Sequence, residues 1–162
     1  MFQHSGLLEV KTVGDREIHM RREFQAPRAL VFEAMTNPEL LKRWLFGPPG
    51  WEMSLCEVDL RAGGKFRYEW RHSDGQFMAM GGLFVEVAPP ERIVQIEKFD
   101  VAWYPGEMTA TMELHEAEGR TVLTMRLVYD LPEGRAAALK TPMADGMSMG
   151  YDRLAALLEE LR

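Results

Sequence analysis

The sequence predicts an α+β fold in which an antiparallel sheet is combined with a long C-terminal helix. Between residues 51 and 131, strand-like segments alternate with turn signals, which is typical of an antiparallel meander. The last twenty or so residues instead place apolar side chains at three- and four-residue steps, the spacing of an amphipathic helix. No internal repeat or linker divides the 162 residues, so we expect one domain over residues 1–162.

The chain opens with strand signals. Residues 16–24 alternate apolar and polar side chains, as a strand with one buried face does. Residues 7–13 give a weaker strand pattern and are joined to that strand through Gly14-Asp15. We therefore treat residues 1–15 as an N-terminal extension or an extra strand.

Two short helices follow the strand at residues 16–24. Pro27 suits the first turn of a helix, and the next apolar residues fall on one face of it: Val31, Phe32 and Met35. Asn37 is a good N-cap residue and precedes Pro38, so a second short helix is predicted there.

Six strands are then predicted in succession. They cover residues 51–60, 65–71, 77–87, 92–99, 107–116 and 120–131. Gly81-Gly82, inside the third of them, favours a bulge or a sharp bend. Together with the strand at residues 16–24, these segments predict a sheet of about six or seven strands.

The C-terminal helix is predicted over residues 141–161. Thr141 is its expected cap, with Pro142 in the first turn. Its apolar face holds Met147, Tyr151, Leu154, Leu158 and Leu161. A helix of this length spans roughly 30 Å, enough to cross a sheet.

Composition narrows the class of protein. The chain is 46% hydrophobic and 27% charged, which is typical of a globular protein and excludes a disordered one. The net charge of −6 argues against nucleic acid as a partner. No segment has the apolar length of a membrane span, and no signal peptide is apparent, so we expect a cytoplasmic protein without membrane insertion.

The segment RWLFGPPGW, residues 43–51, sets large apolar side chains around a Gly-Pro-Pro-Gly turn. They are Trp44, Leu45, Phe46 and Trp51. So much apolar surface is costly to expose in a turn, so these side chains either pack against the core or line a ligand site. The sequence leaves both alternatives open.

Twelve methionines are an unusually large number for a chain of this length. Eight of them fall on segments expected to face the interior or the cavity mouth: Met78, Met80, Met108, Met112, Met125, Met143, Met147 and Met149. Flexible thioethers suit a cavity that accepts ligands of varied shape, but they also suit ordinary core filling. Because Cys56 is the only thiol and histidines are not clustered, we expect no metal and no cofactor.

No catalytic motif is visible. The four histidines are scattered, although His19 and His115 could meet across strands, as Glu57 or Glu97 could meet an inward arginine. Tyr68, Tyr151 and Arg67 are the first candidate proton donors. A binding role is therefore favoured over an enzymatic one.

Four ordered segments resemble one protein family. REFQAPRALVFEAMTNPELLKRW, CEVDLRAGGKFRYEW, VAPPERIV and GMSMGYDRLAALLEEL are similar to signature stretches of the largely bacterial family named for the activator of the heat shock protein 90 ATPase. This family belongs to the START-like (SRPBCC) superfamily, and the match runs from about residue 16 to residue 161. The resemblance implies the helix-grip fold, a curved antiparallel sheet wrapped around the C-terminal helix.

The resemblance also implies a cavity between sheet and helix that often receives an apolar or amphipathic molecule. The matching positions that would line or gate it are Trp44, Phe66, Tyr68, Trp70, Met147 and Tyr151. Relatives commonly carry tryptophan at the positions of Leu45 and Met147, and this chain has an apparent insertion at Phe46. A relative's ligand is therefore a poor guide to the ligand of this protein.

These arguments predict one set of ligand-binding residues. It comprises Trp44, Phe46, Trp51, Phe66, Tyr68, Trp70, Met125, Met143, Met147 and Tyr151. The expected function is binding of a small hydrophobic or amphipathic molecule, in a stress or secondary-metabolite context.

Two alternative functions stay open at this point. The first is a cyclase, dehydratase or hydrolase that uses the same cavity, by analogy with the similar polyketide cyclases and aromatases. The second is a chaperone-associated interaction module, although we expect no chaperone binding from a chain without an added docking domain. A homodimer is compatible with exposed strand edges.

Overall fold

The computed structural model describes residues 2–5 and 7–162, and over these residues nine strands form one antiparallel sheet. The strands are β1 (Phe2–Ser5), β2 (Leu8–Val13), β3 (Glu17–Phe24), β4 (Trp51–Val58), β5 (Lys65–His72), β6 (Phe77–Ala88), β7 (Arg92–Phe99), β8 (Met108–Ala117) and β9 (Arg120–Tyr129). Their order across the sheet is β1-β2-β3-β9-β8-β7-β6-β5-β4. The count exceeds the predicted six or seven because residues of the N-terminal extension form β1 and β2.

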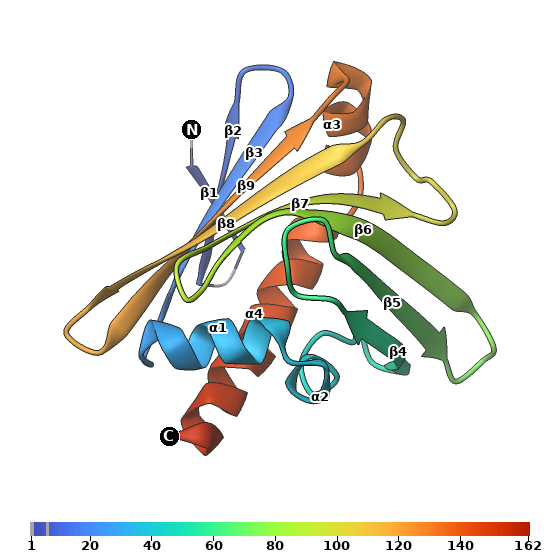
Figure 1. The fold of residues 1–162 in the computed structure, drawn as a ribbon. Coiled ribbons are helices and arrows are strands. Elements are labelled where there is room, and N and C mark those ends of the chain that lie inside the picture. Colours follow the sequence, from blue (N-terminus) through green and yellow to red (C-terminus); the bar gives the residue numbers. More distant parts are fainter. Residues whose placement is uncertain (1, 6) are drawn as a thin grey trace.

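The helices are α1 (Arg28–Thr36), α2 (Pro38–Leu41), α3 (Pro132–Leu139) and α4 (Met143–Leu161). Figure 1 shows α4 lying across the concave face of the curved sheet, with α1 and α2 beside it. The predicted α+β helix-grip fold, with two short helices after β3, is confirmed. None of the helices in the described residues has the length and apolar character needed to cross a membrane.

The two short helices begin as the sequence predicts. Pro27 precedes the first turn of α1, and Val31 and Phe32 are buried on its inner face. The Asn37 side chain accepts a hydrogen bond from the backbone N–H of Glu39, at 3.0 Å, and so caps α2. The helices α1 and α2 together lead the chain into the segment of residues 42–50.

The start of α4 differs from the prediction. Thr141 does not cap this helix, because its hydroxyl donates a hydrogen bond to the carbonyl of Ala138 at 2.7 Å. Thr141 instead follows α3, a helix that ends at Leu139 and that the sequence pattern did not predict. The eight residues of α3 hold three consecutive alanines, and their apolar periodicity is too weak to distinguish a helix from a turn.

The sequence predicted a bulge or a sharp bend at Gly81-Gly82, and the first of these alternatives is wrong for Gly82. It pairs in regular register with Phe66 on β5 and Glu97 on β7, and the irregularity in β6 lies between Phe84 and Glu86. A Cβ atom at Gly82 would lie 2.1 Å from the carbonyl oxygen of Ile96 and 2.4 Å from the Phe66 ring. Glycine is therefore needed here for close packing.

An ion pair joins α4 to β3. The Arg22 side chain is only 4% exposed, and its Nη1 donates to Oδ1 of Asp152 at 2.6 Å. The guanidinium carbon also lies 5.2 Å from the centre of the Phe24 ring. Because Arg22 is buried, its charge depends on Asp152 for compensation.

We expect Asp152→Ala to destabilise the protein by about 1–3 kcal/mol, since it leaves a buried guanidinium without its carboxylate partner. The matched control is Glu160→Ala on the same helix, whose carboxylate pairs with Arg43 at 3.1 Å and is exposed. An exposed pair of this kind is worth less than about 1 kcal/mol. Urea unfolding of both variants measures the difference, and equal losses would contradict the expected role of Arg22.

Candidate functional site

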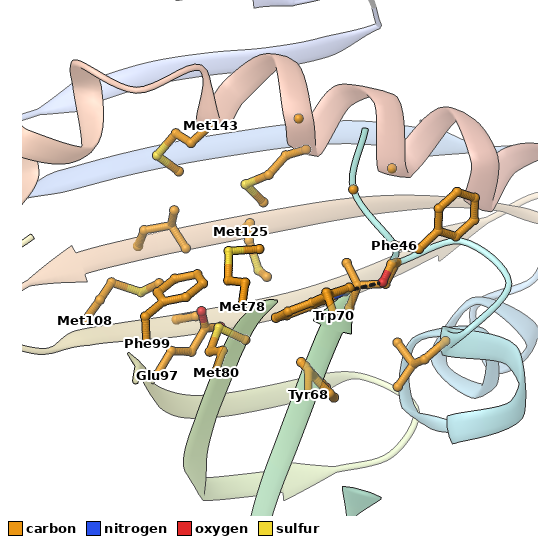
Figure 2. A pocket seen from close by; sticks show the side chains of 18 of the residues that line it. Phe46, Tyr68, Trp70, Met78, Met80, Glu97, Phe99, Met108, Met125 and Met143 are labelled. Atoms are coloured by element: carbon orange, nitrogen blue, oxygen red, sulfur yellow. Dashed lines mark hydrogen bonds between the residues drawn. The ribbon is translucent and has the colours of Figure 1, made fainter. Parts of the chain in front are cut away.

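A cavity of about 570 Å³ lies between the concave face of the sheet and α4. Strands β5 to β9, the segment of residues 42–50 and α4 all contribute side chains to it, several of which Figure 2 shows at close range. Its volume falls in the range of sites that hold small organic molecules. The helix-grip fold has therefore left space inside the sheet that its own side chains do not fill.

The lining of the cavity is almost entirely apolar. All four tryptophans of the chain line it: Trp44, Trp51, Trp70 and Trp103. Eight of the twelve methionines do so as well: Met35, Met78, Met80, Met108, Met112, Met125, Met143 and Met147. Tryptophan contributes a large apolar surface, and methionine contributes an apolar side chain that is flexible. The wall can therefore adapt to the shape of an apolar ligand.

Nine of the ten predicted site residues line this cavity. They are Trp44, Phe46, Trp51, Tyr68, Trp70, Met125, Met143, Met147 and Tyr151. Phe66 does not line it, because its ring packs between Tyr68 and Phe84, at centroid distances of 5.3 and 5.1 Å. That any of these residues binds a ligand stays a prediction.

Two indole hydrogen bonds hold residues 42–50 against the cavity. Nε1 of Trp44 donates to the carbonyl of Ala34 at 2.9 Å. Nε1 of Trp70 donates to the carbonyl of Leu45 at 2.8 Å, as the dashed line at Trp70 in Figure 2 shows. The Trp44 ring is 3% exposed and lies 6.0 Å from the ring of Tyr151 on α4. Trp44 thus belongs to the core and lines the cavity, which combines the two alternatives left open by the sequence.

Phe46 and Trp51 line the cavity but are only partly buried. These two residues form the rim of the cavity. The guanidinium carbon of Arg153 lies 4.1 Å from the centre of the Phe46 ring. The Trp51 ring meets His72 edge-on at 5.3 Å. Neither Arg153 nor His72 lines the cavity. The guanidinium and the imidazole therefore contact the outer side of the rim residues.

Within the described part of the chain, Glu97 is the only acidic or basic side chain that lines the cavity. Its Oε2 accepts a hydrogen bond from Nε2 of Gln95, at 2.8 Å, two residues earlier on the same face of β7. Burial raises the pKa of this carboxyl above its usual value, and the Gln95 hydrogen bond opposes that shift. The sequence suggested an inward arginine as a partner for Glu97, but the structure places Gln95 there.

Tyrosine hydroxyls are the other polar groups of the lining. The hydroxyl of Tyr104 is buried and has no hydrogen-bond partner among the residues that the structure describes. Burial, and then the charge of Glu97, raise the pKa of Tyr104 to about 12. Burial likewise raises the pKa values of Tyr68, Tyr129 and Tyr151, so all four phenols are neutral at physiological pH.

The other candidate catalytic groups do not come together. Nε2 of His19 donates a hydrogen bond to Oε1 of Glu17 at 2.8 Å, and His115 lies opposite Val122 on β9. Arg67 forms an ion pair with Asp100 at 2.7 Å and lies outside the cavity. Within residues 2–5 and 7–162, no group of three or more metal-ligating acidic, histidine or cysteine side chains is found.

Sequence reasoning did not identify Trp103 and Tyr104 as residues of the site. Both belong to the connection between β7 and β8, and nothing in its composition indicates that it folds back over the sheet. Trp103 meets Tyr104 edge-on at 4.6 Å and Phe99 at 5.4 Å. These three aromatic side chains form one wall of the cavity, next to Glu97 along β7.

Comparison with known proteins agrees with this geometry. Residues 25–159 match the model of the family described as activator of Hsp90 ATPase homolog 1-like protein. The chain belongs to this family. Among curated proteins, a search gives no match.

Solved structures of bacterial proteins share the fold of this activator-homologue family. One, from Rhodobacter sphaeroides, is 31% identical, with a TM-score of 0.88 over 94% of this chain and 99% of that chain. Another, from Nitrosomonas europaea, is 27% identical, with a TM-score of 0.80 over 92% and 97%. A third, from Chromobacterium violaceum, is 30% identical, with a TM-score of 0.73 over 90% and 99%. The START-like fold implied by the sequence resemblance is thus confirmed.

Proposed function

We propose that this protein binds a small hydrophobic or amphipathic molecule in the cavity between the sheet and α4. The observation that carries the proposal is the 570 Å³ cavity itself, with its apolar wall of tryptophans and methionines. Removing apolar ligand surface from water gains about 25 cal/mol per Å², so burial alone supplies a driving force. The few polar groups, Glu97 and the tyrosine hydroxyls, are then available to orient the ligand.

Enzymatic use of the same cavity is the second candidate. A carboxyl with a raised pKa in an apolar cavity is the type of group that serves as a general acid or base, and Glu97 meets that description. Such a cyclase, dehydratase or hydrolase would still have to bind an apolar substrate here. Binding is therefore the first activity to measure, whereas no feature of the structure favours the chaperone-associated role.

Native mass spectrometry of the purified protein is the direct test of binding. We expect a small molecule at near-stoichiometric occupancy, which denaturation releases for identification. A ligand-free sample can then be titrated with 1-decanol while intrinsic fluorescence is recorded, because every tryptophan of the chain lines the cavity. No bound molecule and no change in tryptophan emission would contradict the proposal.

A further inference from the structure

Among the residues that the structure describes, the cavity offers a ligand one acidic side chain and no basic one. Glu97 lines it, whereas no described lysine, arginine or histidine does. Gln95, the hydrogen-bond partner of the carboxylate among the described residues, is neutral and occupies a single oxygen. A carboxylate that is partly buried in an apolar cavity without a cation is costly to ionise, and a ligand that supplies the cation offsets that cost.

Tyr104 provides a second, independent observation. Its side chain is 5% exposed and lines the cavity, and its hydroxyl has no hydrogen-bond partner in the described part of the chain. Buried polar groups are normally paired, and an unpaired one in a cavity wall indicates a partner that enters with the ligand. The Tyr104 ring lies 6.5 Å from the ring of Phe99, which follows Glu97 by two residues on the same face of β7, so Tyr104 and Glu97 line the same part of the cavity.

Aromatic rings complete the surroundings of Glu97. Phe99 follows it by two residues on the same face of β7, and Figure 2 shows the two side chains together. Trp103 packs against Phe99, at a centroid distance of 5.4 Å, and against Tyr104 at 4.6 Å. Faces of such rings attract cations, and most strongly where water is excluded.

We propose that the cavity selects hydrophobic primary amines, whose ammonium group pairs with Glu97 while the alkyl or ring portion contacts the methionines and tryptophans. This inference rests on the proposed binding function and names the chemical class of its ligand. A primary ammonium has three N–H donors, enough to reach both the Glu97 carboxylate and the Tyr104 hydroxyl oxygen. A fatty acid of equal length would place a second carboxylate beside Glu97 and is disfavoured.

Three ten-carbon probes separate head-group selection from apolar burial: decylamine, 1-decanol and decanoate. Tryptophan fluorescence titrations at pH 7.5 should rank decylamine tightest and decanoate weakest. Because a charge-assisted hydrogen bond is roughly twice as strong as a neutral one, we expect decylamine to bind at least about tenfold more tightly than 1-decanol.

Glu97→Gln should remove this preference, so that decylamine and 1-decanol bind with similar affinity. Binding of 1-decanol by the variant also shows that its cavity still forms. The matched control is Glu52→Gln, which makes the same charge change on an exposed residue of β4 outside the cavity. Decylamine should keep its advantage in that control. If Glu97→Gln fails to fold, the ranking of the three probes on the natural protein still decides the matter.

The pH dependence gives a third readout. Glu97 must be ionised to pair with an ammonium, so the ratio of decylamine to 1-decanol affinity should fall as the pH drops through the raised pKa of Glu97. The titratable groups that face Glu97 are Tyr68 on β5, Tyr104 before β8, Tyr129 on β9 and Tyr151 on α4. Their pKa values are all raised, so they stay neutral over this range.

Failure of this inference is distinguishable from failure of the proposed function. Equal binding of decylamine and 1-decanol at all pH values would overturn amine selection and leave the binding function standing. Tight decanoate binding that is lost in Arg153→Gln would also overturn it, because the head group would then lie at the rim. If none of the three probes bound, both proposals would fall.

Discussion

Replacing Gly82 with alanine is expected to destabilise the protein by about 3 kcal/mol. The new Cβ would lie 2.1 Å from the carbonyl oxygen of Ile96, and backbone of the neighbouring β7 has to move to accept it. The Phe66 ring, 2.4 Å away, blocks the opposite adjustment. Urea unfolding measures the loss, and circular dichroism shows whether the sheet still forms.

Gly81→Ala is the matched control for Gly82→Ala. The neighbouring glycine lies on the same strand, and a Cβ there would be 3.4 Å from the carbonyl oxygen of Phe66, which is ordinary contact. We expect it to change the free energy of unfolding by less than about 1 kcal/mol. Similar losses for the two variants would contradict the explanation from the close approach of β6 to β7.

Met147→Trp should weaken binding of 1-decanol by about tenfold to a hundredfold. Met147 lines the cavity from α4, and a rigid indole ring there takes space that a flexible thioether yields to a ligand. Overpacking costs about 1–3 kcal/mol, which corresponds to that range of affinities. A shorter alcohol such as 1-hexanol should be affected much less. Isothermal titration calorimetry is the suitable measurement, because the variant adds a fluorophore.

Met149→Trp is the control on the same helix. Met149 is 40% exposed and does not line the cavity, so the same substitution there should leave the affinity for both alcohols unchanged. If the two variants bound 1-decanol equally well, the ligand would not lie against α4. The proposed location would then be wrong, whatever the affinity.

The sequence predicted the local elements of the fold well. Alternation along residues 16–24 and 65–71 identified β3 and β5, and proline together with a capping asparagine located the starts of α1 and α2. The helix-length apolar face of residues 141–161 identified α4 within two residues. Such features depend on neighbours in the chain, which a sequence displays directly.

Features that depend on contacts between distant segments could not be predicted from the sequence as well. Pairing of β3 with β9 brings Met20 opposite Met125, although about a hundred residues separate them in the chain. Local periodicity does not indicate which distant strand will pair with β3. The same limit applies to the site: Glu97 was a candidate, but its isolation from cations became visible only once the surrounding strands were in place. Phe66 shared the alternation of Tyr68 and Trp70, yet close packing with Phe84 covers it.

The concentration of methionines in the cavity wall has a consequence for the chemistry of the protein under oxidative stress. Oxidation converts a thioether into a polar sulfoxide, which makes an apolar surface hydrophilic. Eight of the twelve methionines line the cavity, whereas the single thiol, Cys56, is buried with a pKa raised to about 11 and is a poor target. Peroxide that enters an empty cavity would therefore meet the sulfur atoms that form its wall, and a bound apolar molecule would shield them.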